Sequence, residues 1–296
     1  MLQGVITALV TPMLDNGEID FTSLTKLVEF QINNGVNGLV IAGTTGETAT
    51  LSHAEKHAVV SHIIDVTAKR VKIIVGVSDI ATSNALAAID KLNQISGIDY
   101  ILVLTPAYIK PTQEGLYQHF MAIANVSRRP IILYNVPSRT GCNLADDTVL
   151  RLATASTNIV GLKDATGDMV RCSYLVKNKP EEFAIYSGDD TTALSFNLIG
   201  GNGVISVVSN VLPKRISQMI KYAIEGNKNA AINLNKQVSE LIGVLFVEAN
   251  PIPIKWAVFY NKIIGSPCLR LPLTTLSVPV QKQLASILDA CNAAAI

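Results

Sequence analysis

The sequence predicts an α/β fold, a (β/α)8 or TIM barrel over residues 1–225, followed by a helical C-terminal appendage over residues 226–296. From residue 4 onward, short apolar runs rich in β-branched residues alternate with amphipathic stretches of helical length, which is typical of strand–helix units. The units recur roughly every 25 to 35 residues, enough for a strand, a helix and two short loops. Eight such units indicate a closed barrel rather than an open sheet.

The expected strands are the apolar runs at residues 5–10, 38–42, 72–77, 100–104, 131–136, 159–163, 183–187 and 203–208. The expected helices between them have the periodicity of one buried face and lie near residues 23–33, 54–69, 83–93, 113–125, 145–153, 169–177, 191–198 and 213–224. No strand is predicted after residue 225, where helices are expected at residues 228–247, 254–263 and 278–294.

A doubly wound dinucleotide-binding sheet is the main alternative fold, but its fingerprint is missing. The turn after the first strand reads T-P-M-L-D-N-G rather than G-x-G-x-x-G. The glycine-rich stretch G-G-N-G at residues 200–203 precedes a strand instead of opening a helix, and no P-loop motif occurs. These patterns favour the barrel.

The composition is that of a well-buried globular protein, with 49% hydrophobic residues and a mean hydropathy of +0.35. The net charge is +1 without a basic run, which argues against a nucleic-acid or membrane-surface partner. The cysteines (Cys142, Cys172, Cys268 and Cys291) are scattered without a CxxC pair, as expected for free thiols in a reducing compartment. No targeting segment or membrane-spanning run is recognised, so we expect a cytoplasmic protein with a small-molecule partner.

Lys163 is the first candidate for chemistry, because it lies in the otherwise apolar run I-V-G-L-K-D at residues 159–164. Burial disfavours a charged ammonium, and a neutral amine is a nucleophile that can form a Schiff base with a carbonyl substrate. The alternative is a structural ion pair with a nearby acid such as Asp164.

Two loops after predicted strands carry further candidates, since catalytic groups in such barrels lie at the C-terminal ends of the strands. The first is G-T-T-G-E at residues 43–47, whose glycines and successive N–H groups could hold a carboxylate, although an ordinary turn would look the same. The second follows Tyr134, which alternation can send inward to meet Lys163, and contains Arg139, a bidentate fork for a carboxylate. The alternative for this pair is a core tyrosine beside a solvated arginine.

The histidines (His53, His57, His62 and His119) all fall on predicted helices. The spacing of His53 and His57 puts both on one helical face, but no third ligand is suggested nearby. We therefore expect no metal site, and a metal-dependent aldolase is disfavoured.

Motifs along the whole chain resemble those of the dihydrodipicolinate synthase family, whose members are also called 4-hydroxy-tetrahydrodipicolinate synthases. They are G-T-T-G-E at residues 43–47, T-P-A-Y at 105–108, Y-N-V-P-S-R-T-G at 134–141, G-L-K-D-A-T-G at 161–167, S-G-D-D at 187–190 and N-P-I-P-I-K-W-A at 250–257. Within the wider superfamily of Schiff-base pyruvate aldolases, the arginine of Y-N-V-P-S-R-T-G favours a synthase over N-acetylneuraminate lyase or keto-deoxy sugar-acid aldolase.

The resemblance implies a role for each residue that matches a family motif. Lys163 would be the Schiff-base lysine and Tyr134 the proton relay, assisted by Thr44 and by Tyr108 from a neighbouring subunit of a homotetramer. The substrate-binding positions would be Thr44 and Thr45 for the pyruvate carboxylate, Gly188 and Ile205 through main-chain groups, and Arg139 for the second carboxylate.

The implied reaction condenses pyruvate with L-aspartate 4-semialdehyde, the first committed step of diaminopimelate and lysine biosynthesis. Lysine and hydroxyl side chains can carry its covalent and proton-transfer steps, so no metal or organic cofactor is expected. A sugar-acid lyase of the same superfamily remains an alternative, as does a catalytically silent barrel that senses a small molecule.

Many members of the family are inhibited by L-lysine at a dimer interface, and this sequence departs from the lysine-sensitive pattern. Thr48, Ala49 and His53 remain compatible with that site. The departures are Lys56 in place of a histidine, Ile80 in place of an asparagine, Asn84 in place of a glutamate and Ala107 in place of a tyrosine. The resemblance therefore implies weak or absent inhibition by L-lysine.

Overall fold

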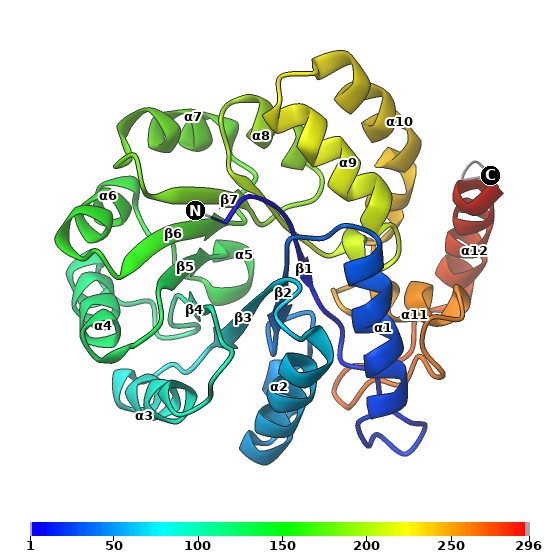
Figure 1. Cartoon of the computed structure of the whole chain (residues 1–296), viewed down its shortest axis with the longest axis horizontal. Coiled ribbons are helices and arrows are strands. Elements are labelled where there is room, and N and C mark those ends of the chain that lie inside the picture. Colours follow the sequence, from blue (N-terminus) through cyan, green and yellow to red (C-terminus); the bar gives the residue numbers. More distant parts are fainter. Residues whose placement is uncertain (1, 294–296) are drawn as a thin grey trace.

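A computed structural model describes residues 2–293, and within them eight parallel strands form a closed barrel in chain order (Figure 1). The strands are β1 (Gly4–Ala8), β2 (Gly38–Ile41), β3 (Lys72–Val77), β4 (Tyr100–Leu104), β5 (Ile131–Asn135), β6 (Ile159–Asp164), β7 (Ala184–Ser187) and β8 (Gly203–Ser206). Each strand pairs with the next and β8 pairs with β1, which confirms the predicted (β/α)8 barrel.

Helices between the strands form the outer ring of the barrel (Figure 1). They are α1 (Phe21–Asn33), α2 (His53–Thr67), α3 (Thr82–Asn93), α4 (Gln113–Val126), α6 (Asp146–Ala155), α7 (Met169–Asn178), α8 (Ala193–Leu198) and α9 (Pro213–Ile224). All lie within a few residues of their predicted positions. Three short helices were not predicted: η1 (Thr48–Thr50), α5 (Pro137–Thr140) and η2 (Val208–Asn210).

The eighth strand ends at Ser206 rather than at residue 208, because the next two backbone N–H groups are hydrogen-bonded to a buried side chain instead of to a neighbouring strand. The Asp190 carboxylate accepts hydrogen bonds from the N–H groups of Val207 and Val208, at 2.8 and 3.2 Å, in place of a strand ladder. The chain then turns into η2. Long-range side-chain bonds of this kind leave no periodic signal in the sequence.

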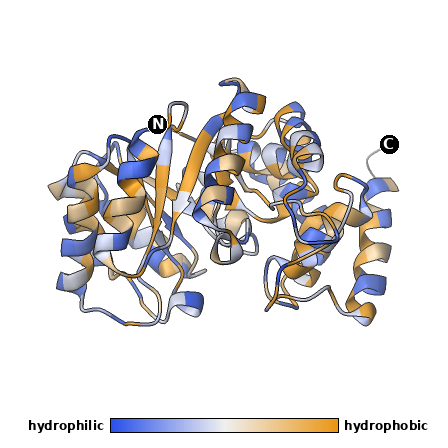
Figure 2. Ribbon diagram, turned by 90° about the horizontal axis from the view of Figure 1, so that it is seen from below, coloured by the Kyte–Doolittle hydropathy of each residue, from blue (hydrophilic) through white to orange (hydrophobic). Residues whose placement is uncertain are grey.

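The apolar side chains form two layers, one inside the barrel and one between the strands and the helices. Ile6, Val40, Ile74, Leu102 and Ile132 belong to the inner layer and are buried. Figure 2 shows hydrophobic residues along the central strands and bands of both colours on the surrounding helices. In this arrangement both faces of each strand are covered, one by the barrel interior and the other by helices, and the apolar face of each helix packs on the strands.

The C-terminal appendage consists of α10 (Lys228–Val244), α11 (Ile252–Tyr260) and α12 (Val278–Ala293), gathered on one side of the barrel in Figure 1. Residue 294 of the predicted last helix lies outside the described residues. Helix α10 packs on α9 and α8 of the barrel, and α12 packs on α10 and α11. The domain division at residue 225 stays a prediction. No helix in residues 2–293 combines the length and hydropathy needed to cross a membrane.

The segment between α11 and α12 is fastened to the start of α2 by Arg270. Its guanidinium pairs with Glu55 and donates to the carbonyl oxygens of Gly17 and Thr50 at 2.8 Å each. Glu55 also closes the capping box of α2 with Ser52. The hydrogen bonds from Arg270 and Ser52 lower the pKa of Glu55 to about 2, and the bond from Arg270 has the larger effect.

The pairing of β5 with β6 contains one irregularity. Ile131 pairs with Ile159, but Ile132 pairs with Gly161, so Val160 has no partner in β5. Because side chains alternate between the two faces of a strand, one extra residue exchanges the faces of all later residues in β6.

The irregularity determines which residue of β6 lies beside Tyr134. With it, Tyr134 pairs with Lys163; an unbroken register would have paired Tyr134 with Leu162. Leu162 instead packs in the layer beneath the helices, and Tyr134 belongs to the layer inside the barrel. Lys163 and Tyr134 are therefore neighbours on the inner face of the barrel.

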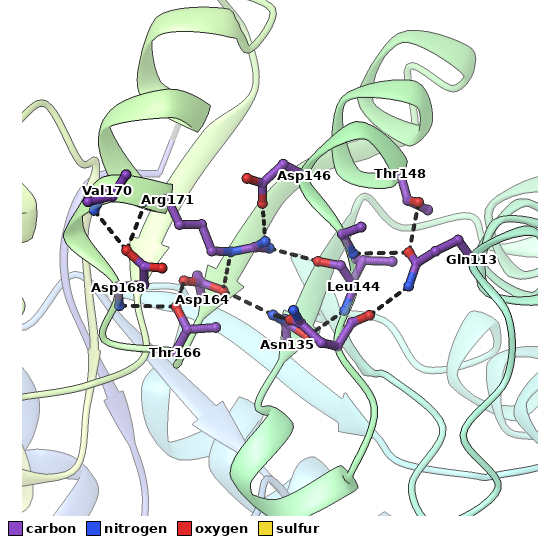
Figure 3. Close-up of polar contacts among 12 residues, drawn as sticks. Gln113, Asn135, Leu144, Asp146, Thr148, Asp164, Thr166, Asp168, Val170 and Arg171 are labelled. Atoms are coloured by element: carbon purple, nitrogen blue, oxygen red, sulfur yellow. Dashed lines mark hydrogen bonds and ion pairs between the residues drawn. The ribbon is translucent and has the colours of Figure 1, made fainter.

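A buried polar network holds this register from the outer side (Figure 3). The next pair in the ladder is Asn135 with Asp164, and Asn135 Nδ2 donates to Asp164 Oδ1 at 3.2 Å. Arg171 Nε donates to the same carboxylate oxygen at 3.1 Å, and Thr166 donates to the other. Asp164 thus has partners on β5, in the loop after β6 and on α7.

Arg171 extends the network to α6. Its guanidinium pairs with Asp146 and donates to the carbonyl oxygen of Leu144 at 2.9 Å. Burial raises the pKa of Asp146, and the Arg171 charge opposes that rise. The ends of β5 and β6 are therefore joined to α6 and α7 by one buried arginine.

Replacing Arg171 by Met should lower the free energy of unfolding by about 3–5 kcal/mol, because it leaves Asp164 buried without its cation. Denaturant unfolding followed by circular dichroism measures the loss. Lys72→Met is the control, since the Lys72 side chain is 54% exposed in its pair with Asp99 and should cost less than about 1 kcal/mol. Equal losses in the two variants would contradict this account of the network.

Candidate active site

A cavity of about 390 Å³ opens at the C-terminal ends of the strands, where sequence analysis expected the site. Its polar wall includes Thr44, Tyr134, Arg139 and Asn250. Its apolar wall is formed by the side chains of Val77, Leu102, Leu104, Val136, Pro251, Pro272 and Leu273, among others. A cavity that is mostly apolar with a few converging polar groups is typical of a small-molecule site.

Lys163 is buried beside Tyr134, with its Nζ 4.0 Å from the centroid of the tyrosine ring. It forms no ion pair with any residue between 2 and 293. Asp164 is engaged instead by Arg171, so the alternative of a structural Lys163–Asp164 pair is wrong. The amine is held against a phenol rather than against a carboxylate.

The Lys163 side chain packs against Gly188, whose lack of a Cβ atom leaves room for it. A Cβ atom at Gly188 would lie 3.0 Å from Cε and 3.1 Å from Cγ of Lys163, and 2.8 Å from the Cβ of Ala165. A larger residue here would crowd both Ala165 and the Lys163 side chain. Ile205, the other predicted main-chain position, is buried on β8 in the same inner layer as Tyr134.

The G-T-T-G-E loop follows β2 and contributes Thr44 to the cavity wall. The hydroxyl of its neighbour Thr45 is buried and accepts a hydrogen bond from Asn250 Nδ2 at 3.0 Å. A hydroxyl that accepts one bond still has its own proton to donate. Thr45 therefore keeps a free donor, although it does not itself line the cavity.

Arg139 lies in α5 and lines the cavity from the exposed side. Its Nη2 donates to the carbonyl oxygen of Asn250 at 3.0 Å. Asn250 therefore touches Thr45 through its side chain and Arg139 through its backbone. The Asn250 Oδ1 atom is buried and has no hydrogen-bond partner among the described residues.

Tyr108 is not brought into the cavity of its own chain. Its side chain is 86% exposed, and its backbone adopts a φ of 74°, which is uncommon for a non-glycine residue. The Tyr108 N–H donates to the carbonyl oxygen of Thr140 at 2.9 Å, which ties this conformation to α5. Its neighbour Ala107 lines the cavity, whereas Tyr108 does not.

The residues predicted for a degenerate regulatory site do not share one cavity. Ala49, Ile80 and Ala107 line the large cavity described above. His53 and Lys56 line a separate cavity of about 90 Å³ between α2 and α3, and Asn84 lines neither.

Lys56, Lys91 and Asp79 are the charged residues that line the smaller cavity. Burial lowers the pKa of Lys56, and the nearby Asp79 carboxylate opposes the shift. His53 and His57 lie at the same cavity. Among residues 2–293, no three histidine, cysteine or acidic side chains are grouped as a metal site would require.

Sequence reasoning assigned no role to Asn250, or to Glu47 and Lys255, whose side chains form a fully buried ion pair beneath the G-T-T-G-E loop. Lys255 could have been found by the argument that found Lys163, since it interrupts the apolar run I-P-I-K-W-A-V-F. Its partner lies 208 residues earlier and could not have been identified from spacing.

Comparison with known proteins shows the family to which the chain is related. The model of the dihydrodipicolinate synthetase family matches residues 1–291. A 4-hydroxy-tetrahydrodipicolinate synthase from Laribacter hongkongensis is 46% identical over 292 residues, which are 99% of each chain.

Solved structures agree with this relationship. The chloride-inhibited dihydrodipicolinate synthase of Acinetobacter baumannii, complexed with pyruvate, is 45% identical with a TM-score of 0.96 over 99% of each chain. The enzyme of Cyanidioschyzon merolae with lysine bound is 36% identical with a TM-score of 0.94 over 98% of each chain. The chain therefore belongs to the dihydrodipicolinate synthetase family.

Proposed function

We propose that the protein condenses pyruvate with L-aspartate 4-semialdehyde through a Schiff base on Lys163, giving 4-hydroxy-tetrahydrodipicolinate for diaminopimelate and lysine biosynthesis. The observation that carries the proposal is the buried Lys163 amine, which lies 4.0 Å from the centroid of the Tyr134 ring and has no ion-pair partner among the described residues. An amine that no carboxylate holds is available to attack a carbonyl carbon.

In the first half-reaction, the neutral Lys163 amine adds to the ketone carbon of pyruvate. Loss of water from the adduct gives an iminium ion, whose positive charge eases removal of a methyl proton to form an enamine. Tyr134 is the neighbouring hydroxyl group that can give and take the protons, with Thr44 at the same cavity wall. Thr44, Thr45 and the main-chain groups of Gly188 and Ile205 would hold the pyruvate.

In the second half-reaction, the enamine carbon attacks the aldehyde of the second substrate, forming a carbon–carbon bond. The substrate amino group then displaces Lys163 from the iminium carbon, which closes the ring and regenerates the enzyme. Arg139 lies at the open side of the cavity, where its guanidinium can bind the carboxylate of that substrate. Each step uses side chains of the protein and the substrates alone.

Treatment with pyruvate and borohydride should add a stable adduct to Lys163, because reduction of the iminium prevents its hydrolysis. Mass spectrometry of the intact protein followed by peptide mapping locates the added mass. Lys163→Ala should remain unlabelled, and peptide mapping of the wild-type protein should find no added mass on Lys255, another buried lysine. A label that persists in Lys163→Ala would contradict the mechanism.

Replacing Arg139 by Ala should lower kcat/KM for the semialdehyde at least about tenfold, since a hydrogen bond to a charged group is worth about 1.5–3 kcal/mol. Labelling by pyruvate and borohydride should stay near the wild-type level. Arg139→Lys keeps the charge without the fork and should show an intermediate loss. Equal loss of turnover and labelling would mean that Arg139 supports the whole site.

We propose that the active unit is a homotetramer in which Tyr108 completes the site of a neighbouring subunit. Support comes from the 86% exposed ring of Tyr108 beside the exposed Ile109, since large exposed apolar groups mark interaction surfaces. Mixed assemblies of inactive Tyr108→Phe and inactive Lys163→Ala protomers should recover part of the activity. If verified mixed assemblies stay inactive, Tyr108 does not act across an interface.

We propose weak or absent inhibition by L-lysine. The Lys56 cation, the Ile80 side chain and the Ala107 methyl group offer no partner for a cationic amino acid, and loss of two hydrogen bonds to charged groups weakens binding about a hundredfold or more. Initial rates at saturating pyruvate should be unchanged at about 1 mM L-lysine, which corresponds to about 4 kcal/mol of binding. Half-inhibition below that concentration would refute this proposal.

We propose a cytoplasmic location because Cys142, Cys172, Cys268 and Cys291 are all free thiols, as in proteins of reducing compartments. Burial raises the pKa of Cys172 to about 12, so this thiol stays protonated and unreactive. Fractionation of cells checks the location.

A further inference from the structure

A fully buried ion pair lies at the cavity wall, which one of its two residues, Glu47, also lines. Lys255 Nζ and Glu47 Oε1 are 2.6 Å apart, and both side chains are fully buried. Burial lowers the pKa of Lys255, and the Glu47 carboxylate opposes the shift. The pair joins α11 of the appendage to the last residue of the G-T-T-G-E loop.

Glu47 sits at the turn that shapes this loop. Its backbone is left-handed, with φ 57° and ψ 36°, a conformation that favours glycine. Its N–H donates to the carbonyl oxygen of Thr44 at 3.1 Å, and Thr48 N–H donates to that of Gly43 at 3.3 Å. These two bonds tie the conformation of Glu47 to the backbone of Gly43 and Thr44.

The residues just before Lys255 hold the same loop and the opposite wall. Asn250 donates from its side chain to Thr45 Oγ1 at 3.0 Å and accepts from Arg139 on its carbonyl oxygen at 3.0 Å. On the other side, Arg270 N–H donates to the second carboxylate oxygen of Glu47 at 3.3 Å. Segments 250–255 and 270 of the appendage enclose the loop between them.

We propose that Lys255 is a positioning residue, which acts through Glu47 to hold Thr44 and Thr45 in the geometry that binds the carboxylate of a 2-oxo acid. The inference rests on the proposed function. It adds that a residue of the C-terminal appendage helps to position the substrate-binding loop. A buried ion pair is a poor source of stability, because desolvation of the two charges offsets their attraction. What the pair supplies is a single direction for the Glu47 side chain and hence one loop conformation.

The test is the pyruvate concentration that gives half-maximal borohydride labelling of Lys163. Glu47→Gln keeps the shape of the side chain but leaves Lys255 buried without its counter-charge, and we expect a rise of at least tenfold. Leu284→Ala in α12, a buried apolar position outside the cavity wall, is the control for lost stability, with less than a twofold rise expected at comparable Tm. Equal changes in the two variants would overturn the proposal.

A second variant separates positioning from stability. Glu47→Leu combined with Lys255→Met replaces the pair by apolar side chains, which should return Tm toward the wild-type value. We expect the pyruvate concentration for half-maximal labelling to stay above that of the wild-type protein. If that concentration returned to the wild-type value together with Tm, the proposal would also be overturned. If the wild-type protein is not labelled at Lys163, the proposed function fails; if it is labelled and both variants match it, only this inference fails.

Discussion

The unpartnered Val160 in the pairing of β5 with β6 is the feature on which the proposed chemistry depends. Without this extra residue, Tyr134 would lie beside Leu162, and the lysine would face the helices. A register can be shifted in this way only if something holds the displaced strand. Asp164 and Arg171 do so by joining β5, β6, α6 and α7 through a buried network on the outer side.

The same network keeps the Asp164 carboxylate from pairing with the Lys163 amine. Asp164 is adjacent to Lys163 in sequence, but alternation turns its side chain outward to Asn135 and Arg171. The Asp164 carboxylate is thereby bound to other residues and does not pair with the Lys163 amine. The appendage supplies the comparable constraint for the loop after β2, because its buried Lys255 reaches Glu47 across 208 residues of sequence. One buried ion-pair system thus lies behind Lys163 and Tyr134, and the other behind the loop that carries Thr44.

Periodicity predicted the barrel and all of its helices longer than one turn, because each strand and helix covers one side of a continuous apolar layer. Lys163 was found by the same means, as an ionisable residue in an apolar run. The position of Val160, the early end of β8 at Ser206 and the contacts of Asn250 depend on residues far apart in sequence. Tyr108 shows the other limit: its side chain is 86% exposed and does not line the cavity of its own chain, and no pattern in the sequence predicted that exposure.

The measurement that tests the account most directly is turnover by the purified protein of pyruvate with L-aspartate 4-semialdehyde. Both substrates should disappear in equal amounts, only when both are present, and without added metal or cofactor. N-acetylneuraminate and keto-deoxy sugar acids, offered separately, should yield no pyruvate. Release of pyruvate from a sugar acid without condensation of the semialdehyde would contradict the proposed function, and no reaction with any of these compounds would indicate a binding protein.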